Sequence, residues 1–185
     1  KALNGHILKI AEKYNAIEQE HPALWPIDLF KKINYFKEFP HQVILCTTVK
    51  QDFQSKKNFS QKYSKDSNFQ TVTVDKHLSN ASFGLGPAVC DTCYYALQNT
   101  KSFQNTVYTT YNKAFRNEVS KISSLDRLPI FSMREIIYVG EEEFVLGMRQ
   151  RIIDDIISFL KEIDLVCKIE TANDPFFTND SLLKN

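Results

Sequence analysis

The side chains best suited to chemistry are concentrated in residues 115–135. Two apolar runs, residues 115–119 and 128–139, flank a polar stretch at residues 120–126, and this pattern predicts a β-hairpin. Side chains alternate along a strand, so residues two or four positions apart point the same way. The hairpin would therefore present five functional side chains on one face: Arg116, Glu118, Arg127, Phe131 and Glu135.

These residue types suit a nucleoside triphosphate. A guanidinium can bind two phosphate oxygens at once, an aromatic ring can stack on a purine, and a carboxylate can order a metal ion or an amine. A solvated hairpin with surface ion pairs is the alternative that residue types alone leave open. The order in which these residues occur distinguishes between the two readings better than the residue types do.

Phe-Arg-x-Glu, a loop, and then Arg-x-x-x-Phe-x-x-x-Glu resembles motif 2 of the class II aminoacyl-tRNA synthetases. The run Met-Arg-Glu-Ile-Ile-Tyr-Val-Gly at residues 133–140 is similar to the amino acid:[carrier protein] ligases, which are seryl-tRNA synthetase-like enzymes without a tRNA-binding domain. Further sequence similar to this family occurs in segments 22–40, 85–97 and 172–177. The resemblance implies an α+β fold, in which an antiparallel sheet is flanked by helices, with residues 1–185 as a single catalytic-core domain.

The resemblance also implies an activity. The family activates a small amino acid, of the glycine or alanine type, with ATP to form an aminoacyl adenylate, and transfers it to the phosphopantetheine of a carrier protein. The implied cofactors are ATP, Mg²⁺ and Zn²⁺. Carried over by position, Arg116 would hold the α-phosphate, Glu118 would help to place ATP, Arg127 would lie near the terminal phosphates, and Phe131 would stack on adenine.

Zinc is expected at Cys90 and Glu135, again by resemblance, where it would bind the α-amino group of the amino acid. Cys90 and Cys93 form a single Cys-x-x-Cys motif. By itself this motif is compatible with half a zinc site, a redox pair or a coincidence. A catalytic zinc normally has three protein ligands and one open position. The role of Cys93 is not indicated by the resemblance.

The family's third zinc ligand and its motif 3 arginine are expected beyond residue 177, and no matching residues follow there. The expectation is therefore a synthetase-like core that is incomplete at its C-terminus. Three interpretations remain: a fragment of a normal ligase, a truncated paralogue that is catalytically inactive and acts as a binding or regulatory protein, or a core completed by a partner chain. Whether the chain is itself an enzyme stays open.

The composition of the chain limits the classes of partner that it is expected to bind. The 185 residues are 43% hydrophobic and 24% charged with a net charge of +1, which is typical of a globular protein and lacks the basic footprint of a nucleic-acid binder. No tRNA or DNA partner is expected, and a genuine tRNA synthetase is the outside alternative. No apolar run is long enough to span a membrane, so the expected location is cytoplasmic. Similarity of residues 5–40 to motif 1 implies a homodimer.

Periodicity predicts the remaining elements. Helices are expected at residues 4–20, capped by Asn4, at residues 27–32 and at residues 141–163. Strands are expected at residues 69–74, at residues 101–110, in a buried form at residues 43–49, and at residues 165–169 around a buried Cys167. The polar residues 51–68 are expected to form a surface helix or loop.

Overall fold

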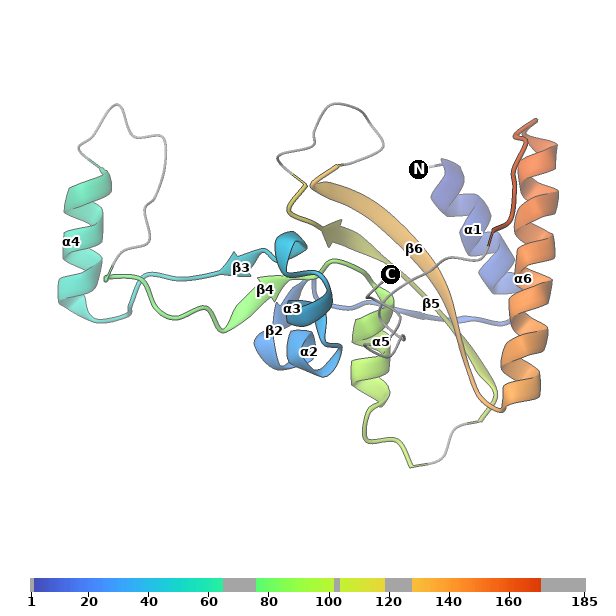
Figure 1. Ribbon diagram of the computed structural model, residues 1–185, viewed down its shortest axis with the longest axis horizontal. Helices are drawn as coiled ribbons and strands as arrows, with labels where there is room; N and C mark the ends of the chain where they lie inside the picture. The colour runs from blue at the N-terminus through green and yellow to red at the C-terminus, as the bar shows by residue number, and fades with distance from the viewer. Residues whose placement is uncertain (1, 65–75, 102–103, 119–127, 171–185) are drawn as a thin grey trace, which may run out of the picture.

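The computed structural model describes residues 2–64, 76–101, 104–118 and 128–170. Within these ranges the strands form two three-stranded sheets, of order β1-β5-β6 and β2-β4-β3 (Figure 1). The strands are β1 (Ile17–Gln19), β2 (Leu24–Pro26), β3 (Leu45–Cys46), β4 (Phe83–Leu85), β5 (Thr106–Phe115) and β6 (Ile130–Val139). The helices are α1 (Ala2–Lys13), α2 (Ile27–Lys32), α3 (Tyr35–Glu38), α4 (Phe53–Tyr63), α5 (Cys90–Leu97) and α6 (Glu142–Glu162), with a 3₁₀ turn η1 (Pro40–Gln42).

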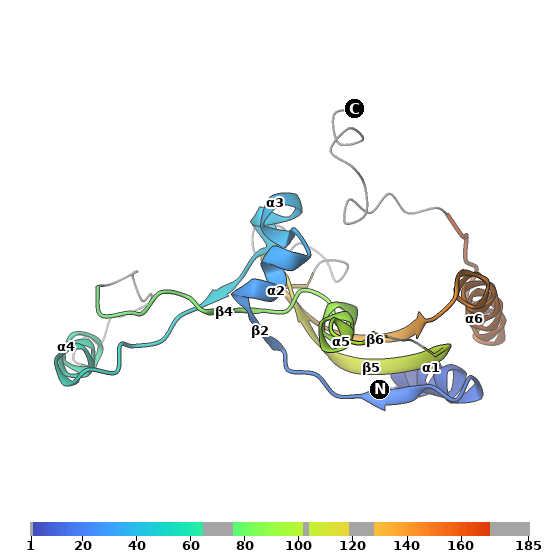
Figure 2. The same cartoon turned by 90° about the horizontal axis from the view of Figure 1, so that it is seen from below.

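The long hairpin of β5 and β6 is the centre of the molecule. Its ten-residue strands pair antiparallel from Thr106 opposite Val139 to Phe115 opposite Ile130, and β1 adds in parallel to the outer edge of β5. Helix α5 lies on one face of this sheet, and α1 lies on the other face beside α6 (Figure 2). The α1 and α6 side is closed by a cluster of Val107, Met148 and Ile152.

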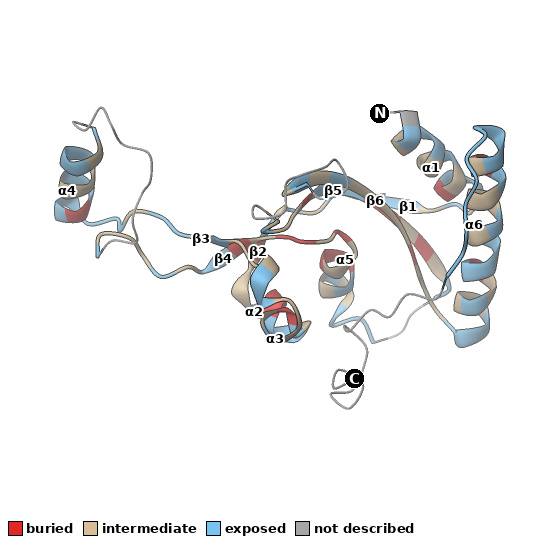
Figure 3. Cartoon of the chain, turned by 45° about the horizontal axis from the view of Figure 1, so that its top comes forward, coloured by how far each residue is buried: buried red, intermediate tan, exposed pale blue. Residues whose placement is uncertain are grey.

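A second core surrounds the buried ring of Trp25. Leu29, Phe30 and Tyr35 from α2 and α3 pack with it, and the Phe30 ring centroid lies 5.4 Å from that of Trp25. Figure 3 shows buried residues gathered where β2, β4, α2 and α3 meet, whereas α4 is mostly exposed. Helix α4 stands at the end of an extended arm, away from the two cores (Figures 1 and 2).

Several sequence predictions are confirmed. The helix at residues 27–32 is α2, the helix at residues 141–163 is α6, and the polar insertion contains the exposed α4. The apolar stripe of α6 buries Met148 and Ile152 as expected. No helix in the described part of the chain combines the length and hydropathy that a membrane span requires.

The helix predicted for residues 4–20 is too long, and the Asn4 cap is wrong. Helix α1 begins at Ala2 and ends at Lys13, because Asn15 adopts a left-handed backbone with φ 54° that breaks the helical repeat. Residues Ile17–Gln19 then pair with β5 as strand β1. Ile17 has helical spacing from the apolar residues of α1, but it lies in a strand because it pairs with the edge of β5.

Three strand predictions also change. The first hairpin strand is β5 rather than residues 115–119, so Arg116 and Glu118 lie just beyond its end. Residues 43–49 form the two-residue β3 and, at Val49, an isolated bridge to Leu78, and Leu45 is 52% exposed because β3 belongs to the arm. Residues 165–169 form no strand, and Cys167 is exposed, because no neighbouring strand lies beside them in the described structure. The segments predicted at residues 69–74 and 172–177 lie outside the described residues.

Candidate active site

A cavity of about 740 Å³ lies between α2, α5 and the face of β6 that is opposite α1 and α6. Helix α5 contributes one continuous side, from Cys90 at its start to Gln98 just past its end. The end of α2 and the residues after it form a second side, and Arg116, Met133 and Glu135 contribute the sheet side. The full lining is Leu29, Lys32, Ile33, Asn34, Ala88, Cys90, Asp91, Tyr94, Tyr95, Gln98, Arg116, Met133 and Glu135.

Arg116 stands at the border between this cavity and the hairpin end. Its backbone N–H donates to the Pro129 carbonyl at 3.0 Å, which continues the hairpin pairing by one residue. Its guanidinium Cζ lies 5.1 Å from the ring centroid of Phe131, and its Nε donates to the Pro87 carbonyl at 3.1 Å. One edge of the guanidinium is thus fixed, and the Nη atoms are the ones suited to bind a phosphate.

The register places Phe131 and Glu135 on one face of β6, as the alternation predicted, and the contact between the Arg116 guanidinium and the Phe131 ring puts Arg116 on that face too. Phe131 lies opposite Ala114 and Glu135 lies opposite Thr110, and the side chains at positions 114 and 110 point to the same side as that of Arg116. Arg116, Phe131 and Glu135 therefore share the α5 side of the sheet. Phe131 and Glu118 do not line the cavity, so a nucleotide on Phe131 would lie beyond Arg116. Arg127 lies outside the described residues.

Cys90 and Glu135 both line the cavity, and the Glu135 charge acts on the Cys90 thiol. Burial, the nearby Asp91 carboxylate and the Glu135 carboxylate raise the pKa of the Cys90 thiol. Cys93, almost one turn further along α5, is fully buried, and burial with the Glu135 charge raises its pKa to about 11. Both thiols are therefore protonated near neutral pH in the absence of a metal.

The two residues expected to bind zinc are adjacent, but they do not complete a site. Within residues 2–64, 76–101, 104–118 and 128–170, no group of three His, Cys, Asp or Glu side chains is placed to hold a metal ion. Because catalytic zinc uses three protein ligands, this donor set does not fit zinc without a further ligand. No step of the chemistry below depends on a metal at this position.

Sequence reasoning missed the α2 side of the cavity. Lys32 donates to Gln98 Oε1 at 2.7 Å and pairs with Asp28 at 2.9 Å, with its Nζ 4.9 Å from the Tyr95 ring centroid. Asn34 follows with a left-handed backbone. Residues 22–40 resemble the family, but no local spacing rule brings residues 32–34 to a helix that begins at residue 90.

Comparisons with known proteins agree with this architecture. No protein-family model matches the chain. Over 102 residues it is 33% identical to amino acid–[acyl-carrier-protein] ligase 2 of Bradyrhizobium diazoefficiens, covering 54% of this chain and 30% of that protein. Over 180 residues it is 21% identical to type-2 serine–tRNA ligase of Methanothermobacter thermautotrophicus, covering 92% of this chain and 34% of that protein. The chain thus spans about a third of the length of these relatives.

Solved structures give the same result for the fold. The M. kandleri SerRS, crystallised in complex with A. aeolicus tRNASec, matches 99% of this chain and 36% of its own with a TM-score of 0.84 and 17% sequence identity. A threonyl-tRNA synthetase structure from Cryptosporidium parvum matches 86% of the chain with a TM-score of 0.60 and 12% identity. The α+β fold class predicted from the sequence is confirmed.

Proposed function

We propose that this chain, which has the class II aminoacyl-tRNA synthetase-like fold and is related to the seryl-tRNA and amino acid–carrier protein ligases, is the core of an adenylate-forming ligase. Its reaction activates a small amino acid with ATP and passes the aminoacyl group to the phosphopantetheine thiol of a carrier protein. The observation that carries the proposal is the position of Arg116, between the Phe131 ring and a cavity that contains Glu135.

Activation joins two anions, so the site must supply positive charge. The carboxylate oxygen of the amino acid attacks the α-phosphorus of ATP, a new O–P bond forms, the bond from the α-phosphorus to the oxygen that bridges to the β-phosphate breaks, and pyrophosphate leaves. Mg²⁺, when bound to ATP, would neutralise charge on the phosphates. Arg116 neutralises the charge that builds on the α-phosphate oxygens, and its bond to the Pro87 carbonyl fixes it before the reaction. Phe131 supplies the apolar ring for adenine, Glu118 helps to place ATP, and Arg127 is assigned to the terminal phosphates.

The amino-acid end of the site is assigned to Cys90 and Glu135. The Glu135 carboxylate is the group that binds the α-ammonium of the substrate in this chain, because it lines the same cavity as Arg116. Zinc at Cys90 and Glu135 would require one ligand more than the described residues provide. The match to a carrier-protein ligase and the net charge of +1 favour a carrier protein over tRNA as acceptor.

We also propose a homodimeric assembly and a cellular location for the protein. One face of the β2-β4-β3 sheet carries exposed apolar side chains, with Leu24 44% and Phe83 45% exposed, and this supports a homodimer formed through the N-terminal segment. We assign residues 1–185 to one domain and the protein to the cytoplasm. The second candidate function is an inactive binding protein, favoured because the described residues provide no third zinc ligand beside Cys90 and Glu135.

The test is ATP–pyrophosphate exchange with Mg²⁺, Zn²⁺ and a panel of small amino acids, together with calorimetric ATP binding. Exchange with one amino acid is expected, and Arg116→Gln should lower it by about 10²-fold or more. Arg149→Gln is the matched control, because Arg149 is an exposed arginine on α6 outside the cavity lining. A folded chain that neither exchanges pyrophosphate nor binds ATP would contradict the proposal and favour the inactive binding protein.

A further inference from the structure

Thr110 carries a buried hydroxyl that has no hydrogen-bond partner among the described residues. It lies near the middle of β5 and is 1% exposed, and its Oγ1 atom makes no hydrogen bond within the part of the chain that the structure describes. A hydroxyl in this position has given up its hydrogen bonds to water without replacing them, which destabilises the fold. The residues around Thr110 therefore have to explain why a hydroxyl is placed there.

The preceding residue, Thr109, is just as buried but is fully bonded. Its Oγ1 donates to the Glu135 carbonyl at 2.9 Å and accepts from Arg134 at 3.1 Å, and Arg134 also binds Asn4 of α1. Because successive side chains of a strand point to opposite faces, Thr109 lies on the α1 side of the sheet and Thr110 lies on the α5 side. The structural role at this level of the sheet thus belongs to Thr109, and it does not use the hydroxyl of Thr110.

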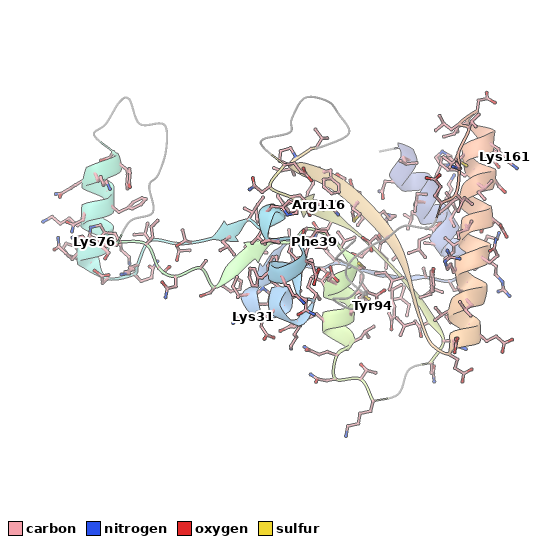
Figure 4. All side chains as sticks on the ribbon, in the orientation of Figure 1. Lys31, Phe39, Lys76, Tyr94, Arg116 and Lys161 are labelled. Atoms are coloured by element: carbon pink, nitrogen blue, oxygen red, sulfur yellow. The ribbon has the colours of Figure 1, made fainter. Side chains whose placement is uncertain are left out.

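Glu135 lies directly opposite Thr110 in the pairing of β5 with β6. Side chains in such a pair share one face and have Cβ atoms about 4.5–5.5 Å apart, so rotation of the two side chains can bring the hydroxyl to the carboxylate without moving the backbone. Glu135 also lines the cavity, together with Arg116 and Tyr94, which are labelled in Figure 4. The Glu135 side chain is therefore placed between the buried hydroxyl and the space for a ligand.

We infer that Thr110 is a positioning residue: its hydroxyl donates to one oxygen of the Glu135 carboxylate when the other oxygen binds the α-ammonium of the amino acid. The inference rests on the proposed function. A carboxylate accepts hydrogen bonds at both oxygens, so the ammonium and the hydroxyl do not compete. The hydroxyl gains its missing partner only in the complex, and the free energy lost by burying it in the free chain is recovered as tighter binding of the amino acid.

The first experiment measures thermal unfolding of the chain without ligands. Thr110→Val removes the hydroxyl and keeps a β-branched side chain, so it should raise the Tm by about 2–4 °C. Thr109→Val is the matched control, because Thr109 is equally buried but loses two hydrogen bonds, and its Tm should fall by at least as much. A Thr110→Val chain whose Tm does not rise would overturn the inference, since the hydroxyl would then have a partner in the free chain.

The second experiment measures the KM for the amino acid and the KM for ATP separately in pyrophosphate exchange. Thr110→Val should raise the KM for the amino acid by about tenfold, because a hydrogen bond to a charged group is lost, and should leave the KM for ATP within about twofold. Thr110→Ser keeps the hydroxyl and should restore most of the amino-acid affinity. Equal changes in the two KM values, or a Thr110→Ser chain that behaves like Thr110→Val, would overturn the inference.

Further outcomes separate this inference from the proposed function. A parent chain that exchanges pyrophosphate, with a Thr110→Val variant of unchanged KM, overturns the inference and leaves activation standing. If the parent shows no exchange, saturation-transfer NMR with glycine and with alanine tests Thr110 by itself. Weaker binding in Thr110→Val than in the parent and in Thr110→Ser then supports the inference while activation fails. A parent that neither exchanges pyrophosphate nor binds either amino acid overturns both.

Discussion

Arg134 Nη1 donates a hydrogen bond of 3.1 Å to Thr109 Oγ1, and Thr109 Oγ1 donates in turn to the Glu135 carbonyl at 2.9 Å. Arg134 and Glu135 are neighbours in the chain whose side chains lie on opposite faces of β6. The Arg134 guanidinium also binds Asn4 of α1 and Glu18 of β1. The backbone that carries Glu135 in the cavity is therefore tied to the N-terminal elements.

This relationship predicts that Arg134→Met destabilises the fold. Its side chain is only 6% exposed, so the substitution leaves Thr109 and Asn4 without a charged donor and should lower the free energy of unfolding by about 2–3 kcal/mol. Urea unfolding measures the change. Glu18→Gln is the control, with an expected loss below about 1 kcal/mol, because Glu18 is 58% exposed. Equal losses in the two variants would show that the network adds nothing beyond the ion pair.

Gly86 is predicted to tolerate no side chain. A Cβ at this position would lie 2.5 Å from Trp25 Nε1, inside a core in which Trp25 is 1% exposed. Gly86→Ala should therefore cost about 1–3 kcal/mol of stability through overpacking, measured by thermal unfolding. Gly147→Ala is the comparison, since nothing lies within 4 Å of a Cβ there on α6, and it should stabilise by about 0.5–1 kcal/mol. A neutral Gly86→Ala would mean that the Trp25 ring can move aside.

The cysteines are predicted to differ sharply in reactivity. Cys167 is exposed, whereas Cys93 is fully buried and has a pKa raised to about 11, so at pH 8 it is both inaccessible and protonated. Iodoacetamide at pH 8 should label Cys167 within minutes and spare Cys93 until urea unfolds the chain, as read by peptide mass spectrometry. Protection of Cys167 in the folded chain would contradict its exposed position and restore the buried strand expected from its apolar neighbours.

Helix α4 is predicted to lose stability in acid through Asp52. The Asp52 carboxylate accepts from the Ser55 N–H at 2.8 Å, and this hydrogen bond lowers the pKa of Asp52 below its usual value. The folded form therefore binds its proton less readily than the unfolded form, so the stabilisation is present above the ordinary Asp pKa and is lost as pH falls through the lowered one. Amide hydrogen exchange of α4, corrected for the intrinsic pH dependence, should show weaker protection on acidification.

Asp52→Asn separates the cap from its charge. Asparagine caps helices about as well as aspartate and does not titrate, so the variant should keep its α4 protection across the same pH range. If the variant and the parent lose protection together, another group controls α4.

The resemblance to the class II synthetases predicted the fold class, and local patterns in the sequence predicted how several elements and side chains are arranged. Apolar positions three and four apart specified α6, and the alternation along residues 131–135 placed Phe131 and Glu135 on one face, because both patterns depend only on local geometry. The position of Cys90 at the start of α5 agreed with the family-like wording around it. These features need no knowledge of distant contacts.

Tertiary structure decided what local patterns left undetermined. Ile17 joined a strand because β5 offered a free edge, Cys167 is exposed because no described strand lies beside it, and Arg116 became part of the site through the distant Pro87 carbonyl. Lys32 and Asn34 reached the cavity because the core around Trp25 holds the end of α2 against α5. Each outcome depends on the pairing of segments far apart in the chain, whose free energy comes from shared burial and hydrogen bonding that no single segment encodes.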